Sequence, residues 1–160
     1  MLNYQALYPS RVVLVTSIDS KGKPNIITLA WTCILSMKPF MVGIAVSPKR
    51  YSHKLICASK EFVINLPTIE LKEACMLCGT KSGKTADKFK EAGLTPVESE
   101  KAKAPRIAEC YAWLECKLVN SVETGDHTLF VGEVVASGER EATAGAIYDT
   151  KGEKLTEIKA

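Results

Sequence analysis

Residues 47–53, with the sequence SPKRYSH, bring together two serine hydroxyls, two cations and a histidine. They directly follow an apolar run at residues 40–46, and the chain from Tyr51 onward has the pattern of a helix start. Backbone amides at a helix N-terminus, with hydroxyl, lysine and arginine donors beside them, suit an anion such as a phosphate monoester. The same residues also suit a plain Ser/Pro helix cap whose charges face water. The segment alone leaves both interpretations open.

A CxxC motif occupies residues 75–78. Such a motif is a redox pair in thioredoxin-like sites and half of a zinc site in zinc ribbons. The sequence holds no second CxxC, and Leu71, Ala74, Cys75 and Cys78 recur at the spacing of one helix face. Core packing is therefore the favoured role, with a redox or cofactor-adjacent role as the alternative.

His53 and His127 are the two histidines of the chain. His127 follows Gly125 and Asp126 in a predicted hairpin turn, from which an imidazole would project at the start of a strand. That position suits ligand binding or proton transfer. The sequence contains neither a Rossmann GxGxxG motif nor a P-loop, so a bound nucleotide would need another fold.

Hydrophobic periodicity predicts a mainly β protein with inserted helices. Strands are predicted at residues 11–18, 25–33, 40–46, 61–66, 107–122 and 128–137, with a short one at 146–148. Helices are predicted at residues 51–59, from 69 to about 78, and at 84–92, where Lys84, Thr85 and Lys88 would share one face. Antiparallel connections between most strands predict a small β-barrel with a helical excursion.

The composition predicts one globular domain over residues 1–160. Hydrophobic residues make up 46% and charged residues 24% of the chain, and the net charge of +3 is spread without a basic block. Nucleic acid and membrane surfaces are therefore not expected partners. Most of the six cysteines lie inside apolar runs, which is typical of a reduced interior, and no signal peptide or membrane span is visible. We expect a cytoplasmic protein.

Five segments, in this order along the chain, carry a resemblance: NIITLAWTC, KPFMVGIAVSPKRYSH, EFVINLP, CGTKSGKTADKF and GDHTLFVGEV. The sequence resembles the flavin reductase-like family of FMN-binding split β-barrels, above all its flavoredoxin and ferric-reductase-like branch. The resemblance extends from about Tyr8 to Ser137. Within it, the GDH motif followed by an apolar strand with Gly and Glu is the most diagnostic piece.

The resemblance implies a homodimer that holds one FMN per subunit near the interface. It implies that Ala30, Trp31, Thr32 and Cys33 run past the flavin ring and ribityl chain, and that Ser47, Arg50, Ser52 and His53 hold the phosphate. Lys84, Thr85 and Lys88 would join the phosphate site. The histidine of the GDH motif, His127, would bind nicotinamide and is the candidate catalytic residue.

The implied activity is an oxidoreductase that passes electrons from NAD(P)H through flavin to an acceptor: free flavin, a ferric complex or a partner protein. The alternative is a flavoredoxin-like electron carrier without its own NAD(P)H site. A third hypothesis is a scaffold that keeps the barrel and has lost the cofactor. The bulk of Trp31 would favour FMN as a retained cofactor over FMN as an exchanging substrate.

Overall fold

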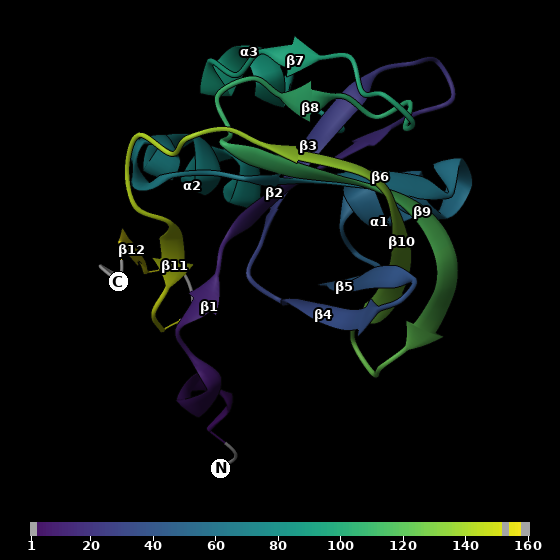
Figure 1. The fold of residues 1–160 in the computed structure, drawn as a ribbon, viewed down its shortest axis with the longest axis horizontal. Coiled ribbons are helices and arrows are strands. Elements are labelled where there is room, and N and C mark those ends of the chain that lie inside the picture. The colour runs from purple at the N-terminus through teal and green to yellow at the C-terminus, as the bar shows by residue number, and fades with distance from the viewer. Residues whose placement is uncertain (1–2, 152–153, 158–160) are drawn as a thin grey trace.

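A seven-stranded antiparallel sheet forms the body of the protein in this computed structural model, which describes residues 3–151 and 154–157 (Figure 1). The strand order is β3-β2-β6-β9-β10-β5-β4. The strands are β2 (Val13–Ile18), β3 (Pro24–Leu29), β4 (Thr32–Met37), β5 (Phe40–Val46), β6 (Glu61–Leu66), β9 (Ala112–Glu123) and β10 (Thr128–Glu139). The fold is a split β-barrel, as predicted.

The sheet curls around an apolar core that includes Phe62, Phe130 and Ile44, all fully buried. The long hairpin of β9 and β10 carries two register shifts, one of them between Val131 and Gly132. Such irregularities bend a strand and allow a sheet to close on itself. A Cβ atom at Gly132 would lie 2.6 Å from the Phe62 ring, so only glycine lets the strand approach this side chain.

Five helices accompany the sheet among the described residues: η1 (Tyr4–Leu7), α1 (Tyr51–Ser59), η2 (Ile69–Leu71), α2 (Lys72–Thr80) and α3 (Lys88–Ala92). Helix α1 packs against β2 and β6, and α2 packs against β3. None of the helices in this part of the chain is long and apolar enough to cross a membrane.

A small second sheet joins the two ends of the described chain. It consists of β1 (Ser10–Arg11), β11 (Ile147–Asp149) and β12 (Leu155–Glu157), in the order β1-β11-β12. The short strands β7 (Pro96–Val97) and β8 (Arg106–Ile107) pair with each other. They lie above β6 and β9 in Figure 1, whereas β4 and β5 lie below. The sheet β1-β11-β12 lies beside η1, so both ends contribute residues to the same region.

Several predicted elements have different bounds in the structure. The strand predicted at 11–18 is divided into β1 and β2. The strand predicted at 25–33 is two strands, because the chain turns at Ala30 and Trp31 and continues as β4. The strand predicted at 107–122 begins at Ala112, since Ile107 pairs with Pro96 instead. The helix predicted at 84–92 begins at Lys88, because the side chain of Asp87 caps it by accepting a hydrogen bond from the Lys90 amide.

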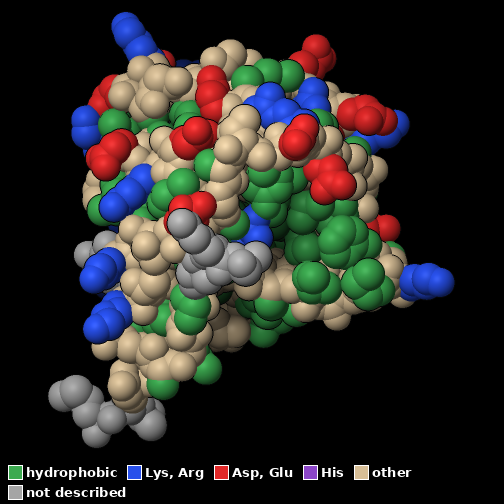
Figure 2. Space-filling model, turned by 60° about the vertical axis from the view of Figure 1, so that its left-hand side comes forward, with side chains coloured by type: hydrophobic (Ala, Val, Ile, Leu, Met, Phe, Trp, Pro, Cys, Tyr) green, Lys and Arg blue, Asp and Glu red, His purple; other side chains and the backbone are tan. Residues whose placement is uncertain are grey.

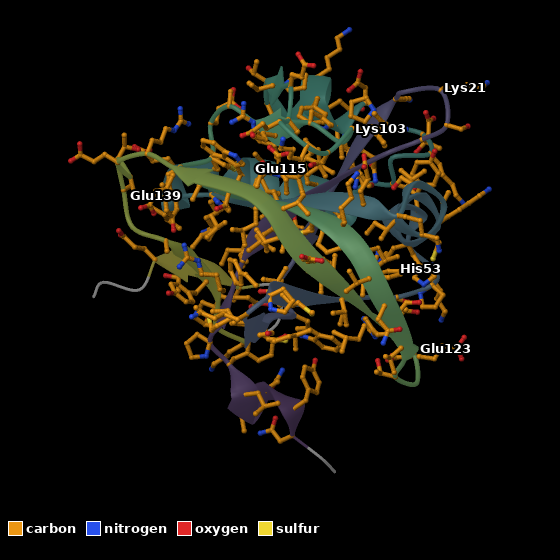
Figure 3. The ribbon with its side chains drawn as sticks, turned by 45° about the vertical axis from the view of Figure 1, so that its right-hand side comes forward. Lys21, His53, Lys103, Glu115, Glu123 and Glu139 are labelled. Carbon is orange, nitrogen blue, oxygen red and sulfur yellow. The ribbon has the colours of Figure 1, made fainter. Side chains whose placement is uncertain are left out.

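Two buried carboxylates attach the loop of residues 99–104 to the sheet. Glu115, fully buried on β9, accepts hydrogen bonds from the backbone amides of residues 100–102 (Figure 3). Glu61 accepts from the amides of residues 103 and 104 and pairs with Lys117. The loop of residues 99–104 therefore covers the face of β9 on which Glu115 lies.

Candidate functional site

An open cavity of about 630 Å³ lies where β3, the end of β5 and the turn before β10 meet. The sheet register brings these segments together. Thr128 pairs with Val46, and the Ala45 amide donates to the Trp31 carbonyl at 3.0 Å. Five of the predicted site residues line this cavity: Ala30, Trp31, Ser47, Arg50 and His127.

A narrower recess of about 100 Å³ adjoins the cavity and shares Ile27, Lys49, Arg50 and Gly79 with it. Its other walls come from α1, from the end of α2 and from the turn at residues 80–83. The predicted residues Ser52 and Lys88 line this recess. Lys49, Arg50 and Lys88 give it a positive charge, as an anion site requires.

Lys88 is the most deeply buried cation of the site, with 5% of its surface exposed. Its Nζ atom donates to the carbonyls of Ile26 and Cys78, both at 2.7 Å. Because an ammonium group has three protons, one donor remains for a ligand in the recess. Burial lowers the pKa of Lys88, and nearby Arg50 lowers it further. A buried cation of this kind is stabilised by an anionic partner.

Asn25 and Ser52 form the floor of the recess. The Asn25 Nδ2 atom donates to Ser52 Oγ at 2.7 Å, and both residues are buried. The Oδ1 atom of Asn25 is buried without a hydrogen-bond partner in the described structure. Gly83 lies directly against this side chain, and a Cβ atom there would come within 1.9 Å of Oδ1. This oxygen is a hydrogen-bond acceptor, so a ligand or water that satisfies it must offer an N–H or O–H donor.

His127 lines the larger cavity and does not line the recess. Its ring packs on Trp31 with 4.6 Å between the ring centroids, and its Nδ1 atom lies 2.7 Å from Asp126 Oδ1. The hydrogen bond from His127 lowers the pKa of Asp126, which is therefore an ionised acceptor. Nδ1 must then carry the proton of this bond, which fixes the orientation of the ring.

His53 does not line either space. Its Nε2 atom lies 2.9 Å from Thr128 Oγ1, its Nδ1 atom lies 3.8 Å from Cys57 Sγ, and its ring packs on Phe130. The side chain therefore connects α1 to the start of β10 (Figure 3). Its position one residue after Ser52 turns it away from the recess, because neighbouring residues on a helix face different directions.

Four other predicted residues also lie outside the two spaces. Thr32 and Cys33 are on β4, beyond the point where Trp31 meets the cavity. Lys84 and Thr85 are exposed in the turn before α3, because that helix begins only at Lys88. Lys49, one of the two cations of SPKRYSH, lines both spaces. Among the lining residues that sequence reasoning did not indicate are Tyr4, Tyr8, Asn25, Gly79 and Asp149.

The CxxC cysteines belong to the core around α2. Cys75 and Cys78 are fully buried and pack with Phe89 and Leu94. Burial raises the pKa of Cys75 to about 12 and that of Cys78 to about 11, which keeps both thiols protonated at neutral pH. In the part of the chain that the structure describes, no cluster of three or more His, Cys, Asp or Glu could hold a metal ion.

Residues 5–155 match the family model described as "Flavin reductase like domain". The chain belongs to this family. It is 48% identical over 135 residues to an uncharacterized protein of Archaeoglobus fulgidus, which covers 84% of this chain and 74% of that relative. The flavoredoxin of Methanosarcina acetivorans has a TM-score of 0.88 at 27% identity, over 100% of this chain and 90% of its own. The NADH:FAD oxidoreductase of Streptomyces globisporus has a TM-score of 0.83 at 25% identity, over 96% and 88%.

The placement of His53 predicts a dependence of stability on pH. Burial lowers its pKa below the ordinary 6.5, so the unfolded state binds a proton more readily than the folded state. The stabilisation is present above pH 6.5 and is lost as the pH falls through the lower pKa of the folded state. We expect the free energy of unfolding, measured by urea denaturation, to fall between pH 7.5 and 5.5, and to fall less in His53→Gln. Lys54→Gln, an exposed neighbour, should behave as the wild type. If the free energy of unfolding depended equally on pH in the wild type and in His53→Gln, this prediction would be contradicted.

Proposed function

We propose that this protein is an FMN-dependent oxidoreductase that takes electrons from NAD(P)H and passes them to an acceptor. The observation that carries the proposal is the continuity between the large cavity and the cationic recess. A flavin mononucleotide has the same two parts, a broad planar ring and a phosphate at the end of a flexible chain. The family membership and the flavoredoxin and NADH:FAD oxidoreductase neighbours support it.

The residues of the recess fit a phosphate. Lys88 offers its free proton, Ser52 offers a hydroxyl and Arg50 offers a planar pair of donors at the junction with the cavity. The segment of Ala30 and Trp31 would lie along the ring in the larger space. Bound FMN would supply the chemistry of hydride acceptance and electron transfer. The protein's own part is to bind and orient this group and to place cations close to it.

Trp31 and His127 form the wall where a second planar molecule would stack. Trp31 is 45% exposed, so its indole is available to a ligand as well as to the imidazole. The imidazole has a defined orientation because Asp126 holds Nδ1. This arrangement favours a nicotinamide donor over a simple carrier, which would need no second ring site.

The alternative is an electron carrier reduced by another protein, and the likeness to a flavoredoxin favours it. Electron acceptors are proposed by class alone: free flavin, a ferric complex or a protein. A small-molecule acceptor would enter through the open mouth of the cavity. A partner protein would instead contact the edge of the flavin at this opening. In both cases, the bulk of Trp31 supports FMN as a bound cofactor over FMN as an exchanging substrate.

A homodimer is the third part of the proposal. The edge strand β4 exposes 69% of Ile34, 43% of Leu35 and 71% of Met37. Figure 2 shows hydrophobic side chains gathered around a hollow on this half of the molecule. An unpaired edge with apolar side chains is a pairing surface, and the family resemblance makes a second copy of the chain its expected occupant. Thr32 and Cys33, on the same strand, would then lie at the interface.

The direct test of function is anaerobic reduction of the FMN-loaded protein. We expect the flavin absorbance to bleach on addition of NADH or NADPH, and His127→Ala to slow the bleaching about tenfold while FMN stays bound. Flavin bands that persist with both donors would sink the reductase and favour the carrier. A protein that takes up no added FMN would instead support the scaffold hypothesis.

Arg50 generates a prediction about FMN affinity. Because a charge-assisted hydrogen bond to phosphate would be lost, Arg50→Ala should weaken FMN binding by about 1–3 kcal/mol in a fluorescence titration. Lys54→Ala is the matched control, since Lys54 lies in the helix that Arg50 precedes, is exposed and lines neither space. If both variants bind FMN as the wild type does, the recess is not the phosphate site.

The exposed edge of β4 predicts the effect of a charge at Ile34. We expect the wild type to sediment at twice the mass of one chain and Ile34→Lys to sediment as a monomer, because a lysine at the centre of an apolar interface would lose its hydration. Val97→Lys, on the distant strand β7, is the control and should remain a dimer. A wild-type protein that sediments as a single chain would rule out this part of the proposal.

A further inference from the structure

A separate cavity of about 220 Å³, the β7–β8 cavity, lies beside the hairpin of these two strands. Its walls come from β7, β8, the first residues of β9 and Arg140, which directly follows β10. None of the described residues that line it also lines the larger cavity or the recess. In Figure 1 the β7–β8 hairpin lies above β6 and β9, whereas β5, which contributes to the larger cavity, lies below.

The most deeply buried lining residues of the β7–β8 cavity are apolar. Ile107 and Cys110 are each 2% exposed, and Val97 and Trp113 add apolar surface. Burial raises the pKa of Cys110, so its thiol stays protonated and packs like a small apolar group. An apolar cavity of about 150 Å³ can hold one benzene molecule. The β7–β8 cavity therefore has room for a single ring with a small substituent.

Arg106 supplies a cation whose position is fixed. Its Nε and Nη2 atoms both donate to the carbonyl oxygen of Glu98, at 3.1 and 2.9 Å, and its Cζ atom lies 4.5 Å from the centroid of the Trp113 ring. A guanidinium group has five N–H donors, so the two in use leave three for a ligand. Because these contacts already hold the side chain, binding costs less conformational entropy.

Arg140 brings a second guanidinium group to the same cavity. Its Nη2 atom donates to the carbonyl of Ala108, another lining residue, and four of its five N–H donors remain. Neither Arg106 nor Arg140 forms an ion pair with a carboxylate in the part of the chain that the structure describes. The cavity thus combines an apolar interior with two cations that lack an anionic partner.

We propose that the β7–β8 cavity binds a small apolar carboxylate. The one-ring body of this ligand packs on Ile107 and Cys110, and its carboxylate pairs with Arg106 and Arg140. A guanidinium group binds a planar carboxylate through parallel N–H···O bonds, which a lysine could not offer. The apolar interior favours a ligand whose charge is joined to an apolar group. This second ligand site is independent of flavin binding, because other residues form it.

The test compares three small ligands on the protein as purified. Benzoate has both the ring and the charge, benzamide has the ring without the charge, and acetate has the charge without the ring. Binding is followed by NMR of the indole N–H groups of Trp31 and Trp113, the two tryptophans of the chain. The variant Trp31→Phe removes one signal and so assigns both. Trp113 then reports on the β7–β8 cavity and Trp31 on the larger one.

Benzoate should shift the Trp113 signal and leave the Trp31 signal in place. We expect its dissociation constant to be lower than that of benzamide or acetate by about tenfold. Arg140→Gln should weaken benzoate binding by about tenfold and leave benzamide binding unchanged, because it removes charge-assisted hydrogen bonds alone. Lys101→Gln is the matched control, since Lys101 is exposed, carries the same charge and lines none of the three spaces.

Three results would overturn the proposal. If benzoate bound no more tightly than benzamide and acetate, the arginines and the apolar interior would not act on one ligand. If benzoate shifted the Trp31 signal and not that of Trp113, the anion would bind in the larger cavity instead. If Arg140→Gln bound benzoate as the wild type does, the carboxylate would not pair with this arginine. None of these results would change the proposed function.

Discussion

The antiparallel pairing of β5 with β10 is the constraint on which the site depends. Thr128 faces Val46 in this register, so the last residues of β5 and the first of β10 lie at the same end of the sheet. The segment with the sequence SPKRYSH begins directly after β5, and His127 directly precedes β10. One strand pairing therefore brings together two segments that are about eighty residues apart in the sequence. A shift of one residue would turn every side chain of the strand to the other face.

The polar groups buried in the recess distinguish it from an ordinary gap in packing. A lysine with 5% exposure and an asparagine oxygen without a partner each cost free energy in the folded protein. Two main-chain carbonyls offset part of the cost for Lys88, and Ser52 satisfies one end of Asn25. The unused proton of Lys88 suits an anion that neutralises its charge, whereas the Asn25 oxygen is an acceptor and needs a donor. Uncompensated groups of this kind are typical of functional sites.

Elements with a clear local pattern could be predicted from the sequence. Phe40–Val46, Tyr51–Ser59 and Glu61–Leu66 have the predicted bounds, because continuous apolar runs and a Ser/Pro start define them locally. The positions of Arg50 and His127 beside the cavity could also be predicted, because each residue lies next to the end of a strand. His53 lies outside the predicted phosphate site, because the direction of its side chain depends on its position in helix α1 and not on the SPKRYSH motif.

The residues that no sequence pattern indicated come from distant parts of the chain. Asn25 reaches the recess because it touches Ser52 and Gly83, and neither contact is visible without the fold. Tyr8 reaches the rim because the sheet β1-β11-β12 holds the first described residues beside Trp31. The helix start predicted at Lys84 is wrong for a local reason. Asp87 caps the helix, so it begins at Lys88 and leaves Lys84 and Thr85 in the preceding turn.

The central claim is that the recess binds the phosphate of a flavin whose ring fills the larger cavity. A fluorescence titration of the flavin-free protein with FMN and with riboflavin tests it most directly, because the two ligands share the ring and differ in the phosphate. We predict that FMN binds about a hundredfold more tightly, as expected for at least two charge-assisted hydrogen bonds. Equal affinities, or no binding of either ligand, would contradict it.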